Sequence, residues 1–100
     1  MLVHVVNFWL KKGLSAEDIA AFEAGVKSLG QIESLKDFHV GKPAVTRRPV
    51  IDRTYDYCLL TTFDDMQGHD IYQDAPVHLE FIKNCEKYWE RVVIYDSESI

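Results

Sequence analysis

The sequence has few glycines and prolines, which interrupt regular structure, and few cysteines, which cross-link small secreted domains. Its 100 residues include five glycines, three prolines and two cysteines, whereas 47% are hydrophobic and 27% are charged. This composition excludes a disordered or low-complexity chain. Cys58 and Cys85 lack the spacing of metal ligands, so we expect free thiols in a reducing compartment. Residues 1–100 are therefore expected to form a single compact domain.

Positive charge and long apolar runs are also scarce. The formal net charge is −5, and the one basic cluster comprises Lys42, Arg47 and Arg48. So small a cluster on an acidic chain argues against a nucleic-acid partner. No apolar run approaches the length of a membrane span, and no secretory leader is recognisable, so we expect a cytoplasmic protein with no membrane partner.

Four segments have the residue pattern of β-strands. Residues 2–10 and 57–63 alternate between two sets that are both largely apolar, which predicts strands covered on both faces. Residues 36–41 and 91–96 are predicted to be shorter strands of the same sheet. Residues 42–56 hold two prolines and no sustained period, which predicts a long loop that is functional or bound to a partner.

Two segments have helical periodicity. Ser15 is expected to cap the first helix with Asp18 in a short-armed capping box, and the predicted inner stripe comprises Ile19, Phe22, Val26 and Leu29. A short helical segment is expected after Asp64 and Asp65, running through Gln73. Pro76 suits the first turn of the last helix, with Asp74 as the expected cap. Its inner stripe is predicted to contain His78, Phe81, Ile82, Cys85, Tyr88 and Trp89.

The order strand, helix, strand, strand, helix, strand predicts a ferredoxin-like α+β sandwich, with both helices on one face of a four-stranded antiparallel sheet. The opposite face would then expose a large apolar patch. Its predicted members are Val3, Val5, Trp9, Cys58, Leu60, Val93 and Tyr95. We therefore expect two copies to pack sheet to sheet as a homodimer, in a dimeric α+β barrel.

Several short motifs give the chain a resemblance to a known family. They are V-H-V-V-N-F in the first strand, V-G-K-P at 40–43, R-P-V…Y-D-Y at 48–57, Y-x-x-x-P-x-H at 72–78, and Y-W-E-R-V-V-I-Y-D at 88–96. Over nearly its whole length the chain resembles the Dabb family, the stress-responsive A/B barrel domains. The resemblance implies a dimeric α+β barrel. It also implies similarity to a plant branch of polyketide cyclases, which close poly-β-keto chains by intramolecular aldol condensation.

The resemblance to that branch implies that His4, Tyr72 and His78 are the catalytic residues. Two positions depart from the pattern: Val26 stands where the branch has a tyrosine, and Ala75 stands where many family members have a histidine. Forming a carbon–carbon bond requires a base and a donor that steadies the enolate, roles that an imidazole and a phenol can fill. The first turn of a helix disfavours imidazolium, so His78 would remain a neutral base.

Each of these residues also has a purely structural interpretation. His4 shares a strand face with Val6 and Phe8 and should reach the same cavity as His78, but either histidine could simply satisfy a buried partner. Tyr72 could donate to a ligand carbonyl or act as a lid over the core. The expected cavity lining, part of which could open to hold an apolar ligand, comprises Val6, Phe8, Phe22, Val26, Phe38, Leu59, Phe81, Trp89 and Ile94.

The remaining histidines are not expected to join the site. His39 should project to the opposite sheet face and His69 is predicted to lie in a polar turn, so neither a metal site nor a cofactor is expected. Asp96 has two interpretations, because it lies on the inner parity of the last strand. It could orient a histidine, or it could face solvent as many charged strand ends do.

Three functions are compatible with these patterns. The favoured one is a homodimeric Dabb protein that binds an apolar carbonyl compound and acts on it as a cofactor-free lyase or cyclase. The second is a non-catalytic stress-response dimer whose histidines only satisfy the core. The third is a cofactor-free monooxygenase with a quinol-like substrate. An inner cavity reached by His78 and Tyr72 would favour an enzyme or binding protein, whereas a filled interior would favour the second function.

Overall fold

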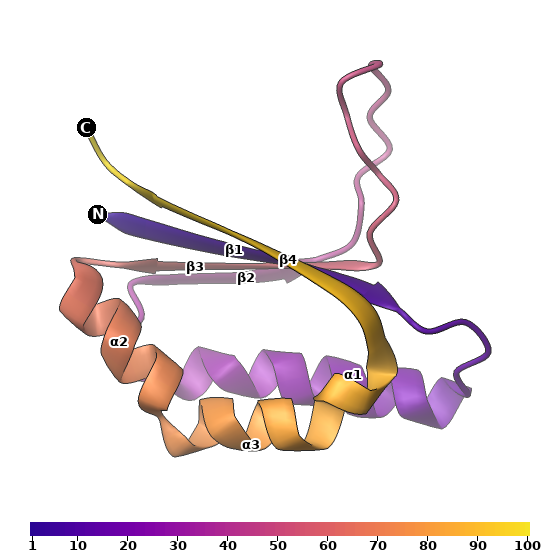
Figure 1. Ribbon diagram of the computed structural model, residues 1–100, viewed down its shortest axis with the longest axis horizontal. Coiled ribbons are helices and arrows are strands. Elements are labelled where there is room, and N and C mark those ends of the chain that lie inside the picture. Colours follow the sequence, from indigo (N-terminus) through magenta and orange to yellow (C-terminus); the bar gives the residue numbers. More distant parts are fainter.

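The computed structural model describes residues 1–100 and contains one antiparallel sheet with all helices on one side (Figure 1). The strands are β1 (Leu2–Leu10), β2 (Asp37–Gly41), β3 (Tyr57–Phe63) and β4 (Trp89–Glu98), in the order β2-β3-β1-β4. The helices are α1 (Ala16–Ser28), α2 (Met66–Asp74) and α3 (Pro76–Cys85), with 3-10 turns at Leu29–Gln31 and Glu86–Tyr88. The predicted ferredoxin-like α+β fold is confirmed.

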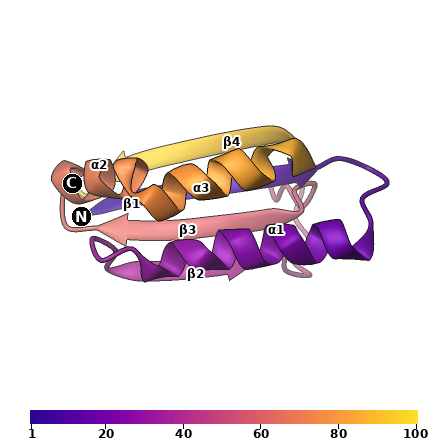
Figure 2. The ribbon, with the colours of Figure 1, turned by 90° about the horizontal axis from the view of Figure 1, so that it is seen from below.

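The helices divide the covered face of the sheet between them. Figure 2 shows α1 against the side formed by β2 and β3, and α3 against the side formed by β1 and β4. Inward residues of β1 such as Val6 and Phe8 are at most 5% exposed, whereas their outward neighbours are half-buried. The alternation of β1 therefore places its inner face in the core. None of the helices has both the length and the apolar character needed to cross a lipid bilayer.

The predicted capping box of α1 is confirmed. The backbone N–H of Asp18 donates to Ser15 Oγ at 3.1 Å, and the backbone N–H of Ser15 donates to Asp18 Oδ2 at 3.3 Å. The predicted inner position of Ile19 is wrong, because its side chain is 37% exposed. The first turn of α1 extends beyond α3 (Figure 1), so the later turns carry the buried stripe.

The predicted start and end of the last helix need correction. Asp74 does not cap α3 but is the last residue of α2, and the N-cap position of α3 is Ala75, which has no capping oxygen. The two helices follow so closely that no residue is left for a polar cap. The last helix ends at Cys85, so Tyr88 lies in a 3-10 turn and Trp89 begins β4, before the predicted strand start at residue 91.

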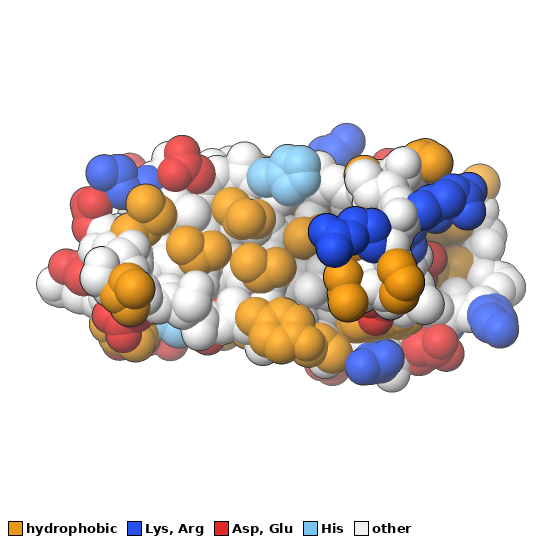
Figure 3. All heavy atoms as spheres, turned by 90° about the horizontal axis from the view of Figure 1, so that it is seen from above, with side chains coloured by type: hydrophobic (Ala, Val, Ile, Leu, Met, Phe, Trp, Pro, Cys, Tyr) orange, Lys and Arg blue, Asp and Glu red, His pale blue; other side chains and the backbone are white.

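The second face of the sheet is apolar and carries no helix. Figure 3 shows hydrophobic side chains gathered over its centre. Six of the predicted patch residues are half-buried and Tyr95 is 66% exposed. The predicted loop, which forms an arm between β2 and β3, rises on this same side of the sheet (Figure 1). The uncovered face and the arm together form one continuous side of the molecule.

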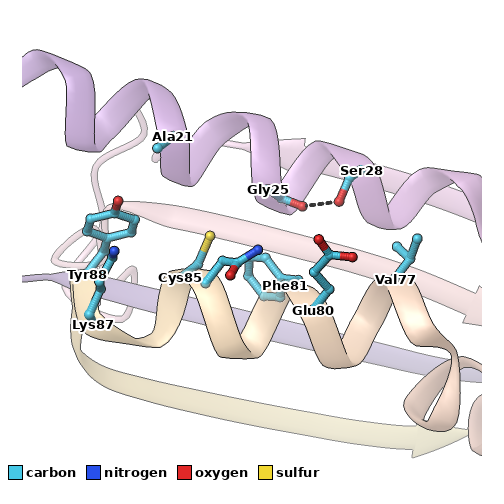
Figure 4. Close-up of a pocket in the computed structure, with 10 residues that line it drawn as sticks. Ala21, Gly25, Ser28, Val77, Glu80, Phe81, Cys85, Lys87 and Tyr88 are labelled. Atoms are coloured by element: carbon cyan, nitrogen blue, oxygen red, sulfur yellow. Dashed lines mark hydrogen bonds between the residues drawn. The ribbon is translucent and has the colours of Figure 1, made fainter.

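Helices α1 and α3 lie in close contact at Gly25. A side-chain carbon added to Gly25 would lie 2.6 Å from Cys85 Sγ and 3.2 Å from Phe81 Cδ1. Cys85 points toward α1 at this place (Figure 4), and both it and Phe81 are buried. Absence of a side chain at Gly25 therefore permits the contact between the two helices, which covers the sheet.

We predict that Gly25→Ala destabilises the protein although alanine is the better helix former. The gain in helix propensity is about 1 kcal/mol, whereas overpacking a core contact costs about 1–3 kcal/mol. Urea unfolding should show a net loss of about 1 kcal/mol in the free energy of unfolding. Adding Cys85→Ala should restore part of this loss relative to the Cys85→Ala single variant. An unchanged or raised stability of Gly25→Ala would contradict the packing described here.

Candidate functional site

A cavity lies between the sheet and the junction of α2 with α3. Its volume is about 160 Å³, and ten of its thirteen lining residues are hydrophobic. The lining residues are His4, Val6, Phe8, Leu29, Leu59, Tyr72, Gln73, His78, Phe81, Ile82, Trp89, Val92 and Ile94. The structure thus brings His4, Tyr72 and His78 to one cavity, together with the predicted lining positions Val6, Phe8, Leu59, Phe81, Trp89 and Ile94.

Three predicted lining residues lie elsewhere in the core. Phe22 stacks against Tyr57 with ring centroids 5.1 Å apart, and Val26 is fully buried beside it on α1. Phe38 lies against Gly30 on the β2 side of the sheet. Phe22 packs directly behind the cavity lining, because its ring centroid is 5.2 Å from that of Phe8. The inward orientation of the three side chains was predicted, but their absence from the lining was not.

Tyr72 and His78 present polar atoms that lack partners. Tyr72 is 0% and His78 8% exposed, and their ring centroids are 4.9 Å apart. Neither the Tyr72 hydroxyl nor His78 Nδ1 forms a hydrogen bond within the protein. A buried polar group left unpaired costs about 1–3 kcal/mol. A ligand that supplies an acceptor or a donor in the cavity would offset that cost.

The burial of these two side chains shifts their titration in opposite directions. Burial lowers the pKa of His78, and the backbone of Gln73 raises it by a smaller amount. The nearby imidazoles of His4 and His69 also lower this pKa. Burial also raises the pKa of the Tyr72 phenol well above its ordinary value. At neutral pH the site therefore holds a neutral imidazole and a protonated phenol, which are a base and a hydrogen-bond donor.

His4 is held by the last strand. It lies opposite Asp96 in the antiparallel register of β1 and β4, and its Nδ1–H donates to Asp96 Oδ1 at 2.5 Å. The imidazole of His4 is 3% exposed, whereas the Asp96 side chain is 45% exposed. Both interpretations of Asp96 therefore hold, because it orients a histidine from a partly solvated position. His4 is also in edge contact with Tyr72, with ring centroids 5.9 Å apart.

The predicted separation of His69 from the other histidines is wrong. Asp65 caps α2 through the backbone N–H of Gly68, so residue 69 lies on a helix instead of in a turn. The His69 ring is 5.1 Å from that of His4, and its side chain is 15% exposed. Gln73, which also lines the cavity, was missed. The signal was present, because His69, Tyr72 and Gln73 have the three- and four-residue spacing of one helical face.

Comparison with known families finds one that spans almost the whole chain. The family model described as Stress responsive A/B Barrel Domain, or Dabb, matches residues 2–99. Comparison with curated proteins finds no match. Among solved structures, a protein from Arabidopsis thaliana is similar at 25% identity with a TM-score of 0.79, and the alignment covers 100% of this chain and 96% of that one.

Two further solved structures extend this comparison. A dimeric ferredoxin-like protein of unknown function from Thermobifida fusca has 18% identity and a TM-score of 0.77, covering 96% of this chain and 88% of that one. A hydroxynitrile lyase from Passiflora edulis has 23% identity and a TM-score of 0.77, covering 96% of this chain and 90% of that one. Both share the fold, and the first is described as a dimer.

The lowered pKa of His78 predicts that acid destabilises the protein. Below the ordinary imidazole value of 6.5, the unfolded chain binds a proton at residue 78 while the folded protein does not. The free energy of unfolding should therefore fall as the pH drops below 6.5, until the folded pKa is reached. Urea unfolding across this range should show a shallower pH dependence for His78→Gln than for the wild type.

His39, which lies away from the cavity, provides the matched control for this measurement. Its side chain lies on the opposite sheet face, so His39→Gln should retain the wild-type pH dependence. Equal slopes for the wild type and His78→Gln would mean that burial does not shift the titration of His78.

Proposed function

The chain belongs to the stress responsive A/B barrel domain family, and from that premise we propose that it binds a small apolar carbonyl compound in the cavity above α3. One observation carries this proposal. The Tyr72 hydroxyl and His78 Nδ1 are buried, unpaired and close together in a lining that is otherwise mainly hydrophobic. Such a lining accepts an apolar body, and the two polar atoms would fix a carbonyl group.

The same pair could act on the ligand as a cofactor-free lyase or cyclase. Neutral His78 would remove a proton from the carbon beside the carbonyl group, and the electrons of that C–H bond would move onto the carbonyl oxygen. The Tyr72 hydroxyl would donate a hydrogen bond to the resulting enolate. His4, held by Asp96, would keep Tyr72 in place through its edge contact. The hydroxynitrile lyase from Passiflora edulis supports the coarser point that this fold can carry a lyase.

The size of the cavity also supports a second function. Pockets for drug-sized ligands are about 300–1,000 Å³, whereas this cavity is about 160 Å³. A ligand would have to be small or would have to displace half-buried side chains of the lining, such as Ile82 and Trp89. A non-catalytic domain whose dimer performs the biological role would need no such displacement.

We also propose that the uncovered sheet face pairs with a second copy of the chain. Its apolar residues come from three strands, with Val5, Leu60 and Tyr95 in one row across the sheet. The arm rises beside this face, where it would reach the partner (Figure 1). The dimeric neighbour from Thermobifida fusca supports dimer formation by this fold.

The ligand proposal is tested by thermal shift with a panel of small aromatic aldehydes, β-diketones and hydroxynitriles. A compound that binds only the folded state raises the melting temperature. We expect at least one class to do so, and we expect His78→Gln and Tyr72→Phe to weaken its binding. If a bound compound is turned over, His78→Gln should slow turnover by about 100-fold or more.

His39→Gln is the control for this panel and should respond as the wild type does. A panel that leaves the melting temperature unchanged, with both cavity variants clearly less stable than the wild type, would favour the non-catalytic dimer. In that case Tyr72 and His78 would serve the packing of the core.

The dimer proposal predicts that a charge at the centre of the uncovered face separates the two copies. Leu60→Asp would place a carboxylate among apolar side chains, which disfavours association. Light scattering during size-exclusion chromatography should give a dimer for the wild type and a folded monomer for Leu60→Asp. Ile71→Asp, at a 54% exposed position on α2, should remain dimeric. A monomeric wild type would contradict the proposal.

A further inference from the structure

Three metal-ligating side chains converge beside the cavity. His4 comes from β1, His69 from α2 and Asp96 from β4. Each offers one ligand atom, and these atoms all lie within 4.8 Å of one another. Chain segments far apart in the sequence therefore supply two imidazoles and one carboxylate to a single point. This is the donor set of many mononuclear transition-metal sites.

The hydrogen bonds of His69 orient its ring toward this point. Nδ1 of His69 lies 3.1 Å from Asp70 Oδ1, so this nitrogen carries the hydrogen and donates to the carboxylate. Nε2 then carries the lone pair, which accepts a long hydrogen bond of 3.4 Å from the Gln73 side-chain amide that a bound ion would replace. A carboxylate that receives the outer N–H of a metal-binding imidazole is a common feature of zinc sites.

The inner nitrogen of His69 faces a second acceptor. Its Nε2 is 4.0 Å from Asp96 Oδ2, while the other oxygen of Asp96 accepts from His4. A lone pair and a carboxylate oxygen that face each other repel unless a proton or a cation lies between them. A cation between His69 and Asp96 would remove this repulsion and would bind all three side chains at once.

We propose that His4, His69 and Asp96 bind one divalent transition-metal ion of the zinc class. Bonds of about 2.0–2.2 Å in a tetrahedral site place ligand atoms about 3.3 Å apart. The 2.5 Å contact between His4 and Asp96 would widen, and the 4.0 Å gap between His69 and Asp96 would close. The ion replaces the proton on His4 Nδ1, which passes to solvent, and water fills the fourth position.

The chemistry of the ligands selects the ion. Mg²⁺ and Ca²⁺ prefer all-oxygen ligands, whereas two imidazoles and a carboxylate suit Zn²⁺, Co²⁺ or Ni²⁺. The bound ion would tie α2 to the edge strand β4, and it would lie beside the cavity because His4 lines it. This proposal does not depend on the carbonyl ligand, since none of the three residues is the proposed base or donor.

The test uses metal-stripped protein without a histidine tag, titrated with Zn²⁺ in a calorimeter. We expect one Zn²⁺ per chain and a higher melting temperature with Zn²⁺ than with chelator. His69→Gln and Asp96→Asn each remove a ligand and should weaken Zn²⁺ binding by at least about 100-fold, since even the loss of an outer-shell partner costs about 10–100-fold. The visible absorption of Co²⁺-loaded protein should show a low-coordinate site that both variants lose.

Two control variants make the test specific. His39→Gln removes a histidine on the opposite sheet face, which is the proposed dimer face, and should bind Zn²⁺ as tightly as the wild type because residue 39 lies away from the cluster. Asp70→Asn keeps all three ligands and, because Asp70 is exposed, should leave the fold intact while weakening Zn²⁺ binding by about 10-fold. Circular dichroism checks folding. Wild-type binding no tighter than that of His69→Gln, or binding lost in His39→Gln, would overturn the proposal.

Discussion

The structure depends on a sheet that is apolar on both faces in a chain that supplies helices for only one of them. Burial of apolar area is the main favourable term in folding, so α1 and α3 must cover one face completely. Their close approach at Gly25 makes that cover continuous. No helix covers the other face, which carries apolar side chains, and the arm lies on the same side of the sheet (Figures 1 and 3). Association with a second copy would remove this apolar surface from water.

The two halves of the covered face are packed differently. Under β2 and β3, aromatic rings such as Phe22 and Tyr57 fill the space against α1. Under β1 and β4, the short helix α2 meets α3 at an angle, and the cavity opens at their junction. Tyr72 and His78 flank this junction, which falls at Ala75 and Pro76. The break between two helices therefore places a phenol and an imidazole together, and it leaves their polar atoms without protein partners.

The histidines near the cavity differ in their surroundings. His78 has no carboxylate beside it, so burial dominates and keeps it neutral. His4 is paired with Asp96, and His69 with Asp70. Proximity to a carboxylate suits an imidazole for holding a proton or a cation, whereas its absence suits His78 for accepting a proton from a ligand. One face of the sheet can thus carry a base and a cation-binding cluster side by side, since His4 borders both.

Local patterns determined the secondary structure. The alternation of apolar residues in strands, their spacing in helices, and the helix-start signals at Ser15 and Pro76 each depend on only a few neighbouring residues. They also determined that the sheet is two-sided and that His4, Tyr72 and His78 face inward. They could not exclude Phe22, Val26 and Phe38 from the cavity lining, since that depends on which helix lies over which strand. Nor could they bring His69 beside Asp96. That contact requires the pairing register of β1 with β4 and the position of α2 against the sheet. Both arise from long-range packing, which only the tertiary structure decides.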